Sequence, residues 1–196
     1  MKVYIIGSRG KLGSCIAKLA QTVTNPEEAN VIIDVSSPSA LSDALSYKKP
    51  LVIGTTGHSP DQIAHIKASP LPIFLSANFS PGIALLKQFL KHNSQWFDKA
   101  KIEDVHHFNK KDAPSGTALA LASCLKIAPE ITSIREGDVI GKHTVTLNLQ
   151  DESLIIQHNA HSRELFARGA ILAAKFILGK KPGLYSMNDL IESGTI

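Results

Sequence analysis

The first 80 residues repeat one pattern, in which a short apolar segment is followed by a turn and then by a helix. The apolar segments are rich in Val, Ile and Leu and cover residues 2–6, 31–35, 51–53 and 72–75. This repetition predicts a parallel sheet with right-handed crossovers, because parallel neighbours have to be joined by a crossover connection. Ligands of such sheets bind beyond the carboxyl ends of the strands. The turns that follow the strands are therefore the expected binding site.

The first turn carries three glycines at a spacing of three, Gly7, Gly10 and Gly13. Glycines let the backbone approach a pyrophosphate, which then lies against the N-terminus of the following helix. Arg9 replaces the middle glycine of the common G-x-G-x-x-G pattern, so a purely structural turn stays open as an alternative. We predict a dinucleotide site formed by Gly7, Ser8, Arg9, Gly10, Lys11, Leu12 and Gly13.

Two later turns belong to the same edge of the predicted sheet. Gly54, Thr55 and Thr56 follow the third strand, and the run Ser76, Ala77, Asn78 and Phe79 follows the fourth. Both are candidates for further contacts with a nucleotide. Ordinary capped turns of an α/β sheet explain either run equally well by itself.

The segment between the first helix and the next apolar strand is short. A dinucleotide-binding half normally has a strand there that ends in a carboxylate about 20 residues after the glycines and holds the adenosine ribose. Only residues 14–30 are available, so we expect this strand, its helix and its carboxylate to be missing. Glu27 and Glu28 lie near the right sequence distance, but they follow Asn25-Pro26 and need not end a strand. The choice between NADH and NADPH is left undecided.

A cationic loop between a strand and a helix is the second candidate site. The strand is expected over residues 101–105, and Ser115 has the character of an N-cap because Pro114 prevents the helix from starting earlier. Gly116 and Thr117 would then offer backbone N–H groups at the positive end of a helix. Together with the basic residues of the loop they predict a pocket for a carboxylate or phosphate. The alternative is a solvated basic loop before an ordinary helix.

The pattern changes in the second half of the chain. Polar residues alternate with the apolar Val145, Leu147 and Leu149. A turn follows and then a second apolar run over residues 154–156, and this pattern predicts an antiparallel hairpin. Strand following strand indicates a second domain of the α+β class. A further helix is expected over residues 166–178.

The cationic loop also contains a recognisable sequence motif. The run His106-His107-x-x-Lys110-x-Asp112-Ala113-Pro114-Ser115-Gly116-Thr117-Ala118 resembles the signature of the dihydrodipicolinate reductase family, and the three glycines match the G-x-x-G-x-x-G turn of that family. The resemblance implies a Rossmann-type parallel-sheet nucleotide-binding domain, residues 1–78 plus 164–196. It also implies a smaller α+β domain, residues 79–163, that binds substrate and forms oligomers.

The resemblance further implies roles for individual residues. His106 and Lys110 would be the catalytic acid-base pair, and His107, Ser115, Gly116 and Thr117 would hold the substrate carboxylates. Arg163 would add a contact from the domain boundary, although a lone arginine at a helix start is as often a surface group. The turns at 54–56 and 76–79 resemble the segments that line the nicotinamide and ribose side of the family's cofactor site.

The implied reaction is NAD(P)H-dependent reduction of 4-hydroxy-tetrahydrodipicolinate, or dihydrodipicolinate, to tetrahydrodipicolinate in lysine and diaminopimelate biosynthesis. The cofactor would be NADPH or NADH, and family members form homotetramers. One alternative is a nucleotide-binding regulatory protein that has lost catalysis, because parts of the family pattern are shortened. The presence of both His106 and Lys110 speaks against it. Another alternative is a reductase of the same fold that acts on a different anionic imine or carbonyl.

Composition excludes several other classes of protein. No apolar run approaches the ~20 residues of a membrane helix, and the N-terminus has no signal-peptide pattern, so a cytoplasmic location is expected. The net charge of +4 is spread along the chain and suits a small anionic ligand better than nucleic acid. Cys15 and Cys124 are too few for a disulfide framework or a zinc site, and His143 and His158 lack partners at metal-binding spacing. No metal is therefore expected.

Overall fold

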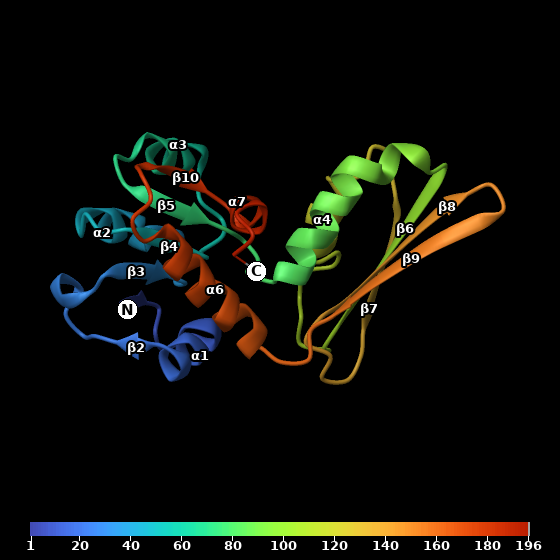
Figure 1. Ribbon diagram of the computed structural model, residues 1–196. Coiled ribbons are helices and arrows are strands. Elements are labelled where there is room, and N and C mark those ends of the chain that lie inside the picture. The colour runs from blue at the N-terminus through green and yellow to red at the C-terminus, as the bar shows by residue number, and fades with distance from the viewer. Residues whose placement is uncertain (196) are drawn as a thin grey trace. The chain divides into compact units, whose positions relative to one another are not determined.

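The computed structural model describes residues 1–195, and the chain divides into two compact units. Unit 1 comprises Met1–Pro81 and Arg163–Ile196, and unit 2 comprises Gly82–Ser162. Figure 1 shows that α6, from the C-terminal part of the chain, lies beside α1 from the beginning. Within the described residues no helix is long and apolar enough to span a membrane.

Unit 1 is built on a parallel sheet with the strand order β10-β5-β4-β3-β1-β2. This confirms the predicted α/β class. The strands are β1 (Lys2–Ile6), β2 (Gln21–Thr22), β3 (Val31–Asp34), β4 (Leu51–Ile53), β5 (Pro72–Leu75) and β10 (Gly183–Tyr185). The helices are α1 (Lys11–Leu19), α2 (Leu41–Ser46), α3 (Pro60–Ala68), α6 (Glu164–Ile177) and α7 (Met187–Glu192), with short 3-10 turns at Pro26–Glu28 and Pro38–Ala40.

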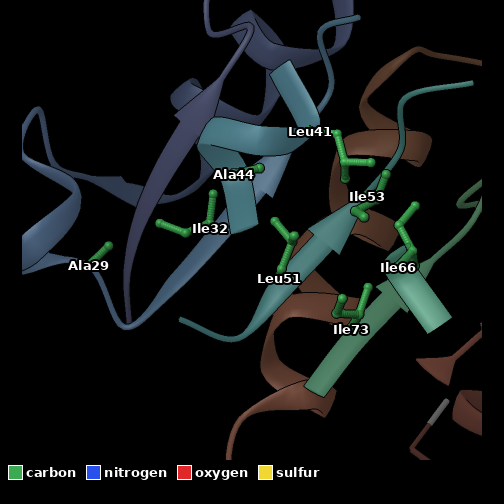
Figure 2. Close-up of a cluster of buried hydrophobic side chains, with 8 residues drawn as sticks. All are labelled: Ala29, Ile32, Leu41, Ala44, Leu51, Ile53, Ile66 and Ile73. Atoms are coloured by element: carbon green, nitrogen blue, oxygen red, sulfur yellow. The ribbon is translucent and has the colours of Figure 1, made fainter. Parts of the chain in front are cut away.

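The core of unit 1 forms because its central strands are apolar on both faces. Every residue of β3 and β4 is buried, as expected for parallel strands covered by helices on both sides. On one face, side chains of the sheet pack against α2 and α3, as Figure 2 shows for Ile32, Leu51, Ile53 and Ile73 with Leu41, Ala44 and Ile66. On the other face α6 contacts β3, β4, β5 and α1. Its buried alanines allow this close approach.

One expectation about unit 1 is wrong. The strand after α1 is not missing, because Gln21 and Thr22 pair with Lys2 and Val3 as the two-residue strand β2. Both residues of β2 are exposed and polar, so no hydrophobic pattern predicted this strand. The helix and further strand that normally follow are absent from the described residues, and the chain passes through a 3-10 turn directly into β3.

Unit 2 is a four-stranded sheet with the order β7-β6-β8-β9. Its elements are α4 (Pro81–Asn93), a 3-10 turn (Ser94–Trp96), β6 (Lys99–His106), α5 (Gly116–Ala122), β7 (Glu130–Arg135), β8 (Lys142–Leu149) and β9 (Glu152–Asn159). The predicted hairpin is confirmed as the antiparallel pair of β8 and β9. Leu86 and Leu90 of α4 and Leu121 of α5 pack with Ile102 and Leu147 of the sheet into the core of this unit.

Candidate active site

The glycine turn of unit 1 is too tight for side chains at two of its positions. Gly7 has a φ of +86°, and a Cβ atom there would lie 2.6 Å from the carbonyl oxygen of Val35. A Cβ atom on Gly13 would lie 2.1 Å from the carbonyl oxygen of Gly7, because α1 begins directly against the end of β1. Gly10 closes the turn with a hydrogen bond from its N–H to the carbonyl of Gly7, at 2.9 Å. The predicted spacing therefore has a structural cause.

The N-terminus of α1 fits a bound pyrophosphate. Its N-cap, Gly10, has no side chain to accept hydrogen bonds from the first turn, whereas α3, α5 and α7 are each capped by a serine hydroxyl. The first N–H groups of α1 are therefore left for a ligand. Arg9 and Lys11 are exposed beside them, and neither side chain has a hydrogen bond or ion pair within the described part of the chain. Ser8 is exposed, and Leu12 is half-buried.

The other predicted nucleotide contacts also lie at the carboxyl edge of this sheet. A Cβ atom on Gly54 would come within 2.6 Å of the Phe79 ring, so these two positions are packed together. Phe79 is only 2% exposed, and its ring stacks on Phe74, so its side chain belongs to the core. Thr55 is buried and accepts a hydrogen bond from the N–H of Ser36, whereas Thr56 is exposed.

The turn after β5 is held in shape by its own side chains. Ser76 donates a hydrogen bond to the carbonyl of Asn78, and the side-chain oxygen of Asn78 accepts one from the N–H of Ser80. Ala77 between them is exposed. Backbone groups and the small Ala77 side chain are thus what this turn offers to a ligand.

In unit 2 the candidate site is organised by a carboxylate that the sequence analysis did not select, Asp104. It is fully buried on β6, and its Oδ1 lies 2.9 Å from Nδ1 of His106 and 3.2 Å from Nε2 of His143. Its Oδ2 accepts the N–H of Ser115 at 2.9 Å and lies 3.3 Å from the Arg135 guanidinium. The register of the sheet causes this convergence, because His143 on β8 and Ser133 on β7 both stand opposite Asp104.

These contacts decide the ionisation of Asp104. Burial alone would raise the pKa of its carboxyl, but the contacts from His106, His143 and Ser115 outweigh burial and hold the pKa well below its usual range. The carboxylate is therefore charged, with Arg135 as the neighbouring cation. It contacts Nδ1 of the His106 ring, and Nε2 of the same ring lies beside Gly141, where a Cβ atom would lie 3.2 Å away.

Lys110 lies in the loop after β6 and is paired with Asp112. Its Nζ is 2.8 and 2.9 Å from the two carboxylate oxygens, and this hydrogen bond is the main reason why the pKa of Asp112 is lowered. Arg135 donates to the carbonyl of Asp112 and so ties the loop to β7. His107 is half-buried, and its N–H donates to the carbonyl of Val139 at 2.7 Å.

The predicted helix start is confirmed at Gly116. Ser115 is the N-cap, and its hydroxyl accepts the N–H of Ala118 at 3.1 Å. The Ser115 side chain is buried and also contacts Nε2 of His143 at 3.3 Å, so Gly116 is the exposed member of this group. Thr117 is half-buried. Arg163 is exposed at the N-cap of α6 and belongs to unit 1, whereas the other predicted substrate residues belong to unit 2.

Sequence reasoning missed Asp104 and Arg135 and considered His143 as a metal ligand, for which it found no partners at the right spacing. A signal was available, since alternate residues of a strand share a face and Asp104 stands two positions before His106. Asp104, His106 and His143 also place one ligand atom each within 4.8 Å of one another, a spacing that could hold a metal ion. Here the Arg135 guanidinium already supplies a positive charge to the same carboxylate.

Comparison with known proteins agrees with this geometry. The family model "Dihydrodipicolinate reductase, N-terminus" matches residues 22–79, and the model "Dihydrodipicolinate reductase, C-terminus" matches residues 82–191. A 4-hydroxy-tetrahydrodipicolinate reductase of Caldanaerobacter subterraneus is 35% identical, with 99% of each chain covered. One of Helicobacter hepaticus is 41% identical, with 85% of this chain and 78% of the relative covered.

The Caldanaerobacter alignment also shows that the chain is shortened. It spans 251 positions, whereas this chain has 196 residues, so at least 55 positions have no counterpart here. Among solved structures, a dipicolinate-bound dihydrodipicolinate reductase from Paenisporosarcina has a TM-score of 0.80 at 19% identity, covering 95% of this chain and 97% of that one. At this identity the similarity shows a shared fold.

Proposed function

The chain belongs to the dihydrodipicolinate reductase family, and from this premise we propose how its residues carry out the reaction. The protein is an NAD(P)-dependent oxidoreductase that reduces 4-hydroxy-tetrahydrodipicolinate in lysine and diaminopimelate biosynthesis. A bound nicotinamide supplies the hydride in such a reaction. The protein has to bind the two ligands, orient them and deliver a proton.

The observation that supports the assignment of the proton donors is the position of His106. It is the last residue of β6, its ring contacts the buried Asp104, and Lys110 follows four residues later in the loop. Addition of hydride to a conjugated C=C–C=N system leaves an anionic, enamine-like species that needs a proton donor within hydrogen-bond distance. We assign this donation to His106 and Lys110.

Lys110 has to be released from Asp112 before it can act on a ligand. Its ammonium is held by both oxygens of that exposed carboxylate, and a dianionic substrate is a competing partner for the same charge. Arrival of the substrate would therefore redirect Lys110 to it. His107, Gly116 and Thr117 would hold the substrate carboxylates, and Ser115 would shape the helix start.

In unit 1, the turn Gly7–Gly13 and the N-terminus of α1 would hold the pyrophosphate. Gly54 to Thr56 and Ser76 to Asn78 would line the nicotinamide side, whereas Phe79 supports them from the core. The uncapped first turn of α1 is the structural feature that supports this assignment.

The test is an assay with enzymatically generated substrate, in which the absorbance of NADH or NADPH is followed. We expect turnover with both cofactors. Lack of turnover with either one in correctly folded protein would exclude the proposed reaction and leave two alternatives, a catalytically degenerate protein and a reductase of a different anionic imine or carbonyl.

We further propose that NADPH is used as well as NADH or is modestly preferred. Arg9 and Lys11 place positive charge beside the glycine turn, and charge-assisted contacts to phosphate are stronger than neutral ones. A contact of roughly 1–3 kcal/mol corresponds to about a 5- to 150-fold effect. Arg9→Ala should therefore raise the KM for NADPH more than the KM for NADH. A preference for NADH of more than about tenfold would contradict the proposal.

The cytoplasmic location and the homotetramer stay predictions. Sedimentation of the purified protein would test the second of these directly, with a tetramer as the expected species.

A further inference from the structure

On the side of β1 that faces β2, only the first residues of β1 are paired with a neighbouring strand. β2 pairs with Lys2 and Val3, and the last bond on this side runs from the N–H of Val23 to the carbonyl of Val3. Tyr4, Ile5 and Ile6 continue for about 10 Å toward the glycine turn at ~3.3 Å per residue. No strand among residues 1–195 accompanies them on that side.

After β2 the chain turns toward the opposite edge of the sheet. Asn30, which follows the 3-10 turn, exchanges hydrogen bonds with Lys2 at the start of β1, and Nζ of Lys49, before β4, donates to the carbonyl of Glu27 at 2.9 Å. Both contacts lie at the amino edge. The glycine turn begins at the carboxyl edge, a strand length of ~16 Å away for five residues. Glu27 and Glu28 therefore do not occupy the place of a ribose-binding carboxylate, despite their sequence distance from the glycines.

The neighbouring loop after β3 offers little that could read a base. Its polar side chains are serines, and their hydroxyls are engaged, since Ser36 donates to Asp34 and Ser37 is paired with Ser39 at 2.8 Å. The side chains that stand free at the glycine turn are that of Ser8, which belongs to the proposed phosphate-binding turn itself, and the charged groups of Arg9 and Lys11. Contacts that such charges make with phosphate oxygens carry no information about the base.

We propose that this chain binds its dinucleotide through the phosphates and the nicotinamide half and does not read the adenine base. The inference rests on the proposed function, because it concerns the same cofactor site. It goes further than the acceptance of both NADH and NADPH, since it covers replacement of the base itself. Analogues that carry another purine on an intact ribose and pyrophosphate are therefore alternative cofactors for this protein.

The experiment compares binding of NADH with that of its hypoxanthine and guanine analogues in reduced form, by calorimetry and nicotinamide fluorescence. We expect dissociation constants within about threefold of one another. A loss of about tenfold or more for either analogue would overturn the inference. If NADH itself fails to bind, the proposed function fails as well. If NADH binds and is turned over while the analogues bind poorly, only the present inference fails.

Two variants sharpen the test. Arg9→Ala should weaken NADH and both analogues by the same factor, because the shared phosphates are affected; unequal losses would indicate contact with the base. The control is the double variant Glu27→Gln and Glu28→Gln, at the amino edge, which should leave all affinities within about twofold. A selective change of NADH affinity in this control would mean that a carboxylate reaches the adenine base and would overturn the inference.

Discussion

Nδ1 of His106 lies 2.9 Å from Oδ1 of Asp104, two residues earlier on the same strand and on the same buried face. The pair links a proposed proton donor to a carboxylate that also contacts Arg135 and His143 and accepts a hydrogen bond from the N–H of Ser115. Orientation of the donor and stability of unit 2 therefore depend on one side chain.

Asp104→Asn should both destabilise the protein and lower its turnover. The substitution keeps the volume of the side chain but leaves the Arg135 guanidinium beside a neutral group. Loss of one partner of a buried ion pair costs about 3–5 kcal/mol. The free energy of unfolding, measured in urea, should decrease by an amount of that order. Turnover should also fall under conditions where the variant is still folded. Glu103→Gln is the matched control, since its ion pair with Lys142 at 3.7 Å is partly exposed and contributes little. Equal stability of the two variants would contradict the central role of Asp104.

Lys110→Ala should lower turnover by about 10²–10⁴, the usual effect of losing a positioned proton donor. Affinity for NADH should stay near that of the wild type, because Lys110 is not among the residues that we propose to hold the nucleotide. Lys111→Ala is the control, since this neighbour is exposed and has no partner within the described residues. Turnover of the Lys110 variant within a few-fold of the control would exclude the assigned role.

Gly13→Ala and Gly10→Ala should differ strongly in their effect on cofactor binding. The new methyl group at position 13 would overlap the carbonyl of Gly7 at 2.1 Å, whereas at position 10 it would lie 3.2 Å from the same oxygen, in an extended backbone conformation open to any residue. We expect the first variant to lose measurable NADH binding and the second to retain it with reduced affinity. Equal affinities would show that the turn is less tightly packed than its geometry indicates.

Acidification should destabilise the protein through His158. Burial lowers the pKa of this side chain, and His143 and His161 nearby act in the same direction. The unfolded chain therefore takes up a proton at about pH 6.5, before the folded protein does, so this contribution to stability is present above that pH and is lost as the pH falls. His158→Gln should flatten the decrease of Tm between about pH 7 and 5 relative to the wild type. An unchanged pH dependence would argue against this origin.

The arrangement of the nucleotide half followed from its pattern, whereas its shortest strands did not. Residues 2–6, 31–35, 51–53 and 72–75 are apolar because parallel strands are buried on both faces, and each became a strand. β2 and β10 are two and three residues long, and β2 is wholly exposed, so neither leaves a hydrophobic period to detect. Such strands are defined by neighbours far away in the sequence.

The loop that we propose to be catalytic could be identified from its sequence, but its supporting carboxylate could not. His106, Lys110 and Ser115 lie in one run, and Ser115 caps α5 as its position before Gly116 predicts. Asp104 follows Lys101 and Glu103, so it has the appearance of one more surface charge on a mixed strand. Its structural role depends on Arg135 and His143, because the pairing of β6 with β7 and β8 brings these two residues next to it.

The two-residue length of β2 has a consequence for the local stability of unit 1. β1 is an interior strand at Lys2 and Val3 but an edge strand at Ile5, whose backbone groups face the side that β2 leaves uncovered. Backbone groups at a sheet edge exchange with water and open at a lower free energy than those of interior strands. We therefore expect local opening of this sheet to begin beside the glycine turn. A bound dinucleotide that holds the turn would suppress this opening.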